Sequence, residues 1–331
     1  MVSTAYKLAM IPTWAMYLEE RFKGSKVQGF KESRDQVCKG YLYPEQHIKE
    51  MVKMKRKTIL ISILLLISTI YIHAIALEKG KIALVYAFDQ EGALLRSKLA
   101  LQDSLIVKGR IFWLGKLIDR NVIVVNSGVG MTNAAMTIQL LIDKFDPQEI
   151  IFTGICGGID SINRIGDIVI PQEWATHDYG YYGKDGYVPD SIYVVLAGKD
   201  KIVPMLFFDV DTTLLDRAKS FLSDLRLKPV KDRIPQVRIG GKGVSGNSFI
   251  DQREKREYLK KQFDAQIVDM ESAAVVQVAN INGIPVLVVR SCSDLAGGSG
   301  SETATEELKE FFKVAADNSA SFVLELLKKL P

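Results

Sequence analysis

The sequence predicts a single α/β domain in which helices cover both faces of a central, mostly parallel or mixed sheet. From Lys81 onward, short apolar runs alternate with segments of helical spacing. Runs such as IALVYAF within 81–88 and VLVV at the start of 286–294 lack the polar alternation of a half-exposed strand. Strands of this kind are buried on both faces, and their alternation with helices is typical of parallel sheets.

The expected elements follow one another along the chain. Strands are expected at 81–88, 121–126, 149–158, 165–174 and 286–294. Helices are expected at 89–99, from about Thr132 after a glycine turn, and at 211–224, 252–263, 271–281 and 302–329. The helix at 271–281 has a clear stop signal, because Asn282-Gly283-Ile284-Pro285 follows it.

The net charge of +4 is unevenly distributed. Residues 1–76 contain 12 Lys or Arg and 6 Asp or Glu, which leaves 31 basic and 33 acidic residues in 77–331. The main body is therefore slightly acidic, which argues against a nucleic-acid-binding domain. Two basic clusters, at 226–233 and 253–261, leave binding of a glycosaminoglycan-like polyanion open as a side role, although such clusters are more often solvated faces.

The basic front end has the features of a secretory signal peptide. Lys55-Arg56-Lys57 precedes an apolar stretch of 14 residues at 59–72, and Ala74-Ile75-Ala76 follows as a small-x-small cleavage site. The sequence thus predicts cleavage after Ala76 and export to the periplasm, the cell envelope or the medium. A retained anchor and a buried core helix are the alternatives, but the stretch is shorter than the ~20 residues that a spanning helix needs.

This interpretation divides the chain into three parts. Residues 1–53 form a leader of uncertain status, because a signal peptide normally starts a chain and Met54 resembles the true start. Residues 54–76 form the signal peptide, and 77–331 form the folded domain.

The cysteines do not indicate a metal site or a cofactor. Cys38 lies in the leader, whereas Cys156 and Cys292 lie in the folded domain. One disulfide is arithmetically possible, but the spacing of the two matches no metal-binding or redox motif. We therefore expect two buried thiols.

Five polar clusters follow the expected strands at their carboxyl ends. They are Asp89-Gln90-Glu91, Ser127 to Gly130, Thr153 to Gly158, Asp269-Met270-Glu271 and Ser291 to Asp294. In open α/β sheets, ligands bind beyond the carboxyl ends of the strands, so five clusters at one edge indicate a site. The glycine-rich turns alone are weak signals, because they fit neither the dinucleotide nor the phosphate-loop pattern.

Several motifs in this order resemble those of the nucleoside phosphorylase/nucleosidase superfamily. They are AFDQEGALLR, SGVG, TGICGG, VSGNSFI, VDMESAAV and VVRSCSDLAG, and they span about 80–331. Within the superfamily the chain is most similar to methylthioadenosine/S-adenosylhomocysteine nucleosidases, with further similarity to exported plant relatives, some regarded as storage proteins. The resemblance implies a nucleoside phosphorylase-like fold, no cofactor, and a homodimer in which a neighbour helps to close the pocket.

The resemblance also implies a role for each matching residue. Glu91 activates the attacking water, Asp294 protonates adenine N7, and Glu271 binds the ribose hydroxyls. Met270 packs beneath the sugar, and Phe249 and Ile250 stack on adenine. Val129 and Gly157 line the pocket, and Arg290 and Ser293 support Glu91 and Asp294, respectively.

Hydrolysis of an N-glycosidic bond needs these residue types. The bond breaks through an oxocarbenium-like state, so one group has to neutralise the leaving base while another delivers water. A carboxylate near the developing cation also stabilises it. A ribose diol would satisfy Glu271, which is otherwise a costly acid at a strand end. The expected substrates are methylthioadenosine, S-adenosylhomocysteine or related 5′-substituted adenosines, cleaved to adenine and a thioribose.

Three departures from the family pattern concern the water and the 5′ substituent. Relatives carry a serine where this chain has Ile155, close to the water. The phenylalanine that caps the alkylthio pocket has no clear counterpart in 297–307, and the sequence at 176–187 also differs. Glycosidic cleavage is therefore better supported than the choice of substituent.

Two alternative functions stay open. A purine nucleoside phosphorylase would bind a phosphate dianion where Glu91 would repel it, and 86–96 lacks the expected Gly/Arg phosphate loop. An exported binding, adhesion or storage protein that kept the fold is the other alternative, suggested by the signal peptide and the basic clusters. Turnover of methylthioadenosine separates the last from an enzyme.

Overall fold

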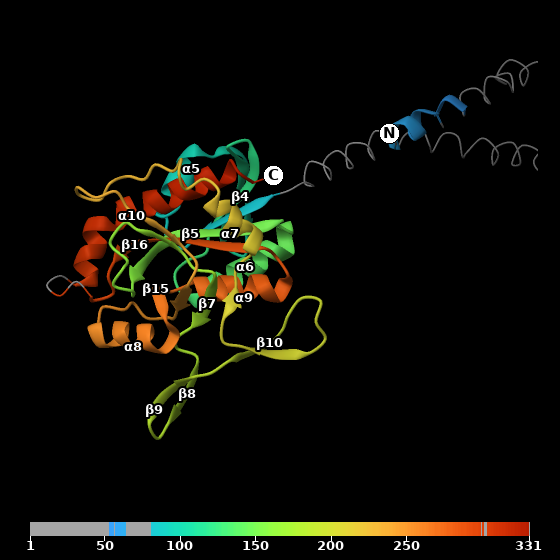
Figure 1. Cartoon of the computed structure of the whole chain (residues 1–331). Helices are drawn as coiled ribbons and strands as arrows, with labels where there is room; N and C mark the ends of the chain where they lie inside the picture. Colours follow the sequence, from blue (N-terminus) through green and yellow to red (C-terminus); the bar gives the residue numbers. More distant parts are fainter. Residues whose placement is uncertain (1–52, 56, 64–80, 299, 301–302, 331) are drawn as a thin grey trace, which may run out of the picture. The chain divides into compact units, whose positions relative to one another are not determined.

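The computed structural model describes residues 53–55, 57–63, 81–298, 300 and 303–330 (Figure 1). The chain divides into two compact units, 1–78 and 79–331. In the first unit the described residues are helical and exposed, while the cleavage site expected after Ala76 lies outside the described residues. Among the described residues, no helix is long and apolar enough to cross a membrane.

Four parallel strands form the centre of the sheet in the second unit. In spatial order they are β4 (Arg120–Asn126), β1 (Ile82–Tyr86), β5 (Glu149–Gly158) and β16 (Val286–Asp294). The register places Leu84 beside both Val124 and Ile151. Side chains on both faces of these strands are buried, which explains why their sequences are continuously apolar.

Further strands extend this core into a mixed sheet of 12 strands within the described part of the chain. The additional strands are β2 (Ala100–Val107), β3 (Arg110–Leu117), β6 (Ile168–Ile170), β7 (Glu173–Thr176), β12 (Phe208–Asp209), β13 (Val237–Ile239), β14 (Lys242–Ser245) and β15 (Ala265–Asp269). The strand β15 is antiparallel to β5 and pairs Val268 with Gly157. The carboxyl end of β15 therefore lies beside the carboxyl end of β5 in the sheet.

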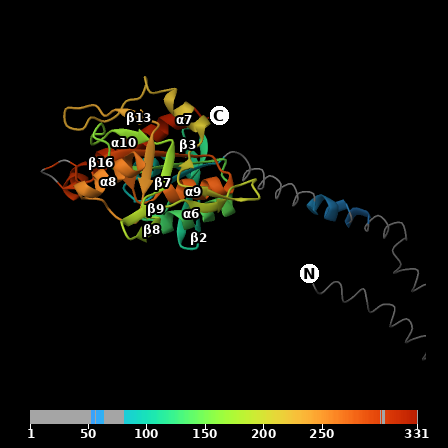
Figure 2. The same cartoon turned by 60° about the horizontal axis from the view of Figure 1, so that its bottom comes forward.

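Helices cover both faces of the sheet, which confirms the expected fold class (Figures 1 and 2). On one face α10 (Ala304–Leu327) packs on β16 and β5 and contacts α5 (Ala93–Lys98). On the other face α6 (Met131–Phe145) packs against α9 (Ser272–Asn282). The remaining elements of this unit are α7 (Thr212–Lys219), α8 (Arg253–Phe263) and two hairpins, β8–β9 (Gly180–Gly183, Gly186–Pro189) and β10–β11 (Ile192–Val195, Ile202–Met205).

Element boundaries differ from the expected ones for local reasons. The strand expected at 165–174 is two strands, β6 and β7, because Pro171 between them has no N–H for a ladder. The helix expected at 89–99 begins only at Ala93, because a turn precedes it in which the Glu91 N–H donates to the Phe88 carbonyl. The helix α9 ends as expected, at Gly283, whose φ of 71° suits glycine.

Candidate active site

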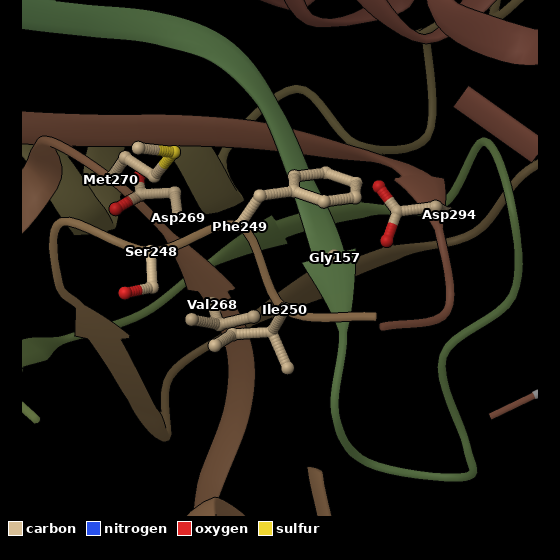
Figure 3. Close-up of a pocket in the computed structure, with 8 residues that line it drawn as sticks. All are labelled: Gly157, Ser248, Phe249, Ile250, Val268, Asp269, Met270 and Asp294. Carbon is tan, nitrogen blue, oxygen red and sulfur yellow. The ribbon is translucent and has the colours of Figure 1, made fainter. Parts of the chain in front are cut away.

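A pocket lies at the carboxyl edge of the sheet, where the polar clusters were expected. Its lining residues are Gly157, Ser248, Phe249, Ile250, Val268, Asp269, Met270 and Asp294 (Figure 3). They come from the ends of β5, β15 and β16 and from the loop between β14 and α8. Figure 3 shows the ring of Phe249 extending toward the carboxyl group of Asp294. The structure thus brings together five of the predicted site residues in one cavity.

The glycine at 157 explains how two strand ends converge here. Gly157 of β5 is the register partner of both Val268 in β15 and Asp294 in β16. A Cβ atom at this position would lie 2.9 Å from Oδ1 of Asp294. Because real Cβ contacts are essentially never that short, a larger residue would push the carboxyl group out of place.

Glu91 is a buried carboxylate held entirely by backbone amides. It follows β1, its exposed fraction is 2%, and its Oε2 accepts hydrogen bonds from the N–H groups of Ala87 at 2.8 Å and Phe88 at 2.9 Å. Its Oε1 accepts from the N–H of Ile155 at 2.9 Å. Burial raises the pKa of Glu91 above its ordinary value, and Arg290 and the three amides act against this rise. Such an environment suits a general base that works near neutral pH.

The contact with Ile155 bears on the serine that relatives carry at this position. A serine side chain is absent here, but the main-chain N–H of Ile155 binds Glu91 directly. A backbone donor does not depend on the side chain, so the orientation of Glu91 is retained with isoleucine. Isoleucine in place of serine therefore removes only the contacts that the serine hydroxyl itself would make.

Arg290 is the single guanidinium among three buried acids. Its Nε lies 2.8 Å from Oδ2 of Asp269, its Nη1 lies 3.7 Å from Oε1 of Glu91, and its Nη2 lies 3.8 Å from Oε2 of Glu271. The side chain is fully buried and stacks on the ring of Phe152 at 4.1 Å. One positive charge cannot neutralise three negative ones, so the cluster favours protonation of at least one acid.

The approach of Arg290 to Glu91 requires a glycine at position 154. Gly154 is the register partner of Arg290 on the neighbouring strand. A Cβ atom there would lie 2.0 Å from Nη1 of Arg290 and 2.3 Å from Oε1 of Glu91. The TGICGG motif thus contains this glycine for a steric reason, since any side chain would displace the ion pair.

Asp269 and Glu271, the two acids of the VDMESAAV stretch, have different tasks. Asp269 accepts hydrogen bonds from the hydroxyls of Ser245 and Ser272 and from the N–H groups of Glu271 and Ser272. Together with Arg290, these donors satisfy it inside the protein. Asp269 is therefore structural, because it fixes the turn that presents Met270 and Glu271.

Glu271 has a weaker set of partners within the protein. Its Oε1 accepts from the N–H of Gly130 at 2.8 Å, at the start of α6, and the more distant Arg290 is its charged partner among the described residues. Burial raises its pKa to about 7, and the charge of Asp269 acts in the same direction. A ligand that donates hydrogen bonds, such as a diol, would satisfy the remaining acceptor capacity of this carboxylate.

Asp294 lines the pocket on the side opposite Asp269 and Met270 (Figure 3). Its exposed fraction is 2%, and it accepts hydrogen bonds from the N–H of Ala296 and the hydroxyl of Ser293, both at 2.9 Å. Burial raises its pKa to about 7, against the effect of these two donors. Ser293 also donates to the Cys156 carbonyl at 3.3 Å. A carboxyl group with a pKa of about 7 keeps a substantial protonated fraction near neutral pH and can act as a proton donor.

Replacing Asp294 by asparagine should stabilise the empty protein at alkaline pH. Because the folded pKa of about 7 exceeds the ordinary value of 3.8, the stability contribution of Asp294 is fully present below about pH 4 and is lost as the pH rises through 7. The full shift corresponds to at most about 4 kcal/mol. We expect Asp294→Asn to raise the melting temperature by several degrees at pH 8 and to leave it unchanged at pH 3.5. An equal effect at both pH values would contradict the raised pKa.

The remaining predicted residues are placed unequally. Ile250 and Met270 line the pocket, and the Phe249 ring is 46% exposed at its mouth. Val129 lies in the loop before α6 and is exposed, and it is not among the residues that line the cavity. Its neighbour Gly130, which binds Glu271, is the residue of this loop that contacts the site.

Sequence reasoning missed a pair of aromatic rings beside Glu91. Phe88 lies three residues before Glu91 and is 39% exposed. Its ring packs edge-on against Phe312 of α10, with 5.9 Å between the centroids. The apolar Phe88 directly before an acidic pair was a usable signal, but nothing in the sequence places it near α10.

No metal centre accompanies this site in the described part of the chain. That part contains no group of three or more His, Cys, Asp or Glu residues arranged to hold a metal ion. Cys156 and Cys292 are buried free thiols on neighbouring strands, with their sulfur atoms 3.8 Å apart, as the sequence led us to expect.

Comparison with known proteins agrees with the fold and identifies the family. The family model described as "Phosphorylase superfamily" matches residues 81–328. The 5′-methylthioadenosine/S-adenosylhomocysteine nucleosidase of Staphylococcus haemolyticus is 34% identical over 75% of this chain and all of its own length. The enzyme of Neisseria meningitidis, solved in complex with methylthio-immucillin-A, superimposes with a TM-score of 0.64 at 28% identity, over 76% of this chain and all of its own.

A third relative is similar to the same degree. The nucleosidase of S. pneumoniae, solved with the transition-state inhibitor MT-ImmA, has a TM-score of 0.63 and 29% identity, over 76% of this chain and all of its own. The chain belongs to the phosphorylase superfamily and, within it, to the family of 5′-methylthioadenosine/S-adenosylhomocysteine nucleosidases.

Proposed function

We propose that this protein hydrolyses the N-glycosidic bond of 5′-methylthioadenosine, S-adenosylhomocysteine or a related 5′-substituted adenosine. The observation that carries the proposal is a set of three buried acids at the carboxyl ends of the strands, each in an environment that suits its step. Glu91 accepts hydrogen bonds from three backbone amides beside Arg290, Glu271 has no close charged partner among the described residues, and burial raises the pKa of Asp294 to about 7.

The steps follow from these environments. The ribose diol donates to Glu271, and the adenine lies between Phe249 and the residues around Asp294. As the glycosidic bond breaks, Asp294 gives its proton to N7, so the base departs neutral. Glu91 takes a proton from a water molecule, which adds to the anomeric carbon. Its negative charge also stabilises the oxocarbenium-like state.

Water fits the position beside Glu91 better than phosphate does. A phosphorylase would have to hold a dianion against a carboxylate that only one guanidinium, shared with two other acids, can offset. A phosphate dianion and the Glu91 carboxylate would repel each other strongly in a buried site. We therefore assign a hydrolase within a superfamily that also contains phosphorylases.

The 5′ substituent is proposed to contact the Phe88–Phe312 pair. Phe88 donates its N–H to Glu91, and its ring packs against Phe312 of α10. The exposed ring of Phe88, backed by the partly buried Phe312, would gain buried apolar surface from a group such as methylthio. This contact favours, within the proposed range, substrates with an apolar 5′ group such as 5′-methylthioadenosine.

The assay of the purified domain decides the function. Incubation with 5′-methylthioadenosine should release adenine, detected by chromatography, and the same sample should act poorly on adenosine, which lacks the apolar 5′ group. No adenine release from any 5′-substituted adenosine would contradict the proposal and would favour a binding or storage role for the same fold.

We also propose that the chain is exported and cleaved after Ala76. The family match begins at residue 81, so the basic and apolar segment at 54–76 stands apart from the catalytic domain. We expect a mature N-terminus at Leu77 in an envelope or extracellular fraction, measured by N-terminal sequencing or mass spectrometry. Intact residues 1–76 on a soluble cytoplasmic protein would rule export out.

The proposal does not extend to polyanion binding. In the cluster at 226–233, Lys228, Lys231 and Arg233 each pair with an acid of the same unit. In the cluster at 253–261, Lys260 pairs with two acids. These four matched charges attract a polyanion weakly, and polyanion binding through the two clusters stays a prediction. The homodimer implied by the family resemblance stays a prediction, which sedimentation of the purified protein would test.

A further inference from the structure

Glu307 is a buried carboxylate that the proposed reaction does not yet use. It lies in the first turn of α10, and its exposed fraction is 2%. Burial of an acid is costly unless it gains a partner. Its Oε2 accepts a hydrogen bond from the N–H of Leu295 at 2.8 Å. Leu295 directly follows Asp294, so this carboxylate is attached to the turn that carries the general acid.

The two carboxylates bind successive amides of one turn. Asp294 accepts from the N–H of Ala296, and Glu307 accepts from the N–H of Leu295. The turn is tight enough that Ala296 has a φ of 51°, in the left-handed region. Glu307 therefore links α10 to the position of the Asp294 side chain.

We propose that Glu307 is a positioning residue that holds the 294–296 turn and keeps a negative charge beside Asp294, so that Asp294 retains its proton until it reaches adenine. The proposal rests on the proposed function, because only a general acid needs that proton. Its electrostatic part is independent of activity and can be measured separately.

The charges around Asp294 support this role. Burial is the main cause of its raised pKa, and Glu307 and Asp251 are the acidic neighbours that act in the same direction. Asp251, in the loop after β14, accepts from the N–H of Ala304 at 2.7 Å, at the start of α10. Arg256 of α8 donates to the Gly158 carbonyl instead of pairing with Asp294. The first turn of α10 interacts favourably with the charge of Glu307.

The test uses Glu307→Gln, which keeps the size and an oxygen that can accept from Leu295 but removes the charge. We expect the pKa of Asp294 to fall by roughly one unit, the scale of a buried charge at close range. Carboxyl ¹³C NMR of aspartate-labelled protein measures this, with the Asp294 resonance assigned by its absence from Asp294→Asn. The alkaline limb of kcat/KM should shift to lower pH by the same amount, with the acidic limb unchanged.

Two further variants separate charge from structure. Glu306→Gln removes a neighbouring charge that is exposed on the same turn, and it should leave the pKa of Asp294 unchanged. If Glu307→Gln does not fold, Glu307→Met removes the charge with a side chain of similar length, and the same fall is expected. An Asp294 pKa that stays within 0.2 of the wild-type value, in whichever charge-free variant folds, overturns the proposal. Absence of turnover in the wild type would refute the proposed function alone, because the NMR titration needs no activity.

Discussion

Asp294→Asn is expected to abolish turnover of methylthioadenosine while leaving adenine binding largely intact. Adenine is a poor leaving group as an anion, so N7 has to gain a proton as the bond breaks. Asp294 lines the pocket, and burial raises its pKa to about 7, so a substantial fraction of it carries a proton near neutral pH. Asparagine keeps the shape and an oxygen that can accept from Ala296, but it cannot transfer a proton. A loss of about 10²- to 10⁴-fold in kcat is the scale for a missing general acid.

Binding and turnover have to be measured separately to interpret this variant. A loss in kcat with adenine affinity retained is the pattern of a group that acts in the transition state. Asp160→Asn is a suitable control, because Asp160 follows β5 and pairs with Lys260 outside the pocket. We expect the control to stay within about twofold of the wild type. An Asp294→Asn protein within about threefold of the wild type would show that another group is the acid.

Glu91→Gln is expected to reduce turnover by roughly 10²-fold or more, the usual scale for losing a positioned base. The glutamine oxygen can still accept one or two of the three amide hydrogen bonds, but the amide can neither take a proton from water nor stabilise the sugar cation. The loss should appear in kcat, since the site for adenine around Asp294 is unaffected. Steady-state kinetics on methylthioadenosine measure both parameters.

A matched control for this variant is Asp89→Asn, two residues earlier in the same turn. Asp89 is exposed and pairs with Arg96 at 3.8 Å and with Asn126, away from Arg290. Its replacement should have little effect on kcat. If the two variants lost activity equally, the turn as a whole would be sensitive, and the role of Glu91 as base would not stand.

The fold could be predicted from the sequence where burial is strongest. The central strands β1, β4, β5 and β16 are covered on both faces, so their residues are continuously apolar. The strands β2 and β3 and the two hairpins were missed. The strand β2 is exposed along its length, and the pattern ALQDSLIV records no buried face. A strand that pairs with its neighbour without burying its side chains is held by backbone hydrogen bonds. These bonds impose little pattern on the amino-acid sequence.

The site could be predicted in its members but less well in their connections. Polar residues after buried strands pointed to Glu91, Glu271 and Asp294, because parallel topology gathers such ends at one edge. Asp269 was seen only as part of a cluster, whereas it is the closest charged partner of Arg290. That contact depends on β15 running antiparallel to β5, a pairing that apolar periodicity does not specify.

Which of the acids carry protons depends on the three-dimensional structure and cannot be predicted from the sequence. Arg290 faces Asp269, Glu91 and Glu271, and Asp294 lies away from this cation with acidic neighbours. The sequence gives four carboxyl groups of similar intrinsic acidity. Burial and the placement of one guanidinium give these acids different environments, which suit the base, the ribose ligand, the structural anchor and the acid of the proposed reaction.

The most direct measurement of the central claim is the identity of the sugar product. Methylthioadenosine is incubated with the purified domain in buffer with and without 50 mM inorganic phosphate (roughly the excess needed to saturate a phosphorylase), and the products are separated by mass spectrometry. We predict adenine and free methylthioribose at equal rates in both buffers, because Glu91 delivers water. Methylthioribose 1-phosphate as the main sugar product, with a rate that depends on phosphate, would contradict the account and identify a phosphorylase.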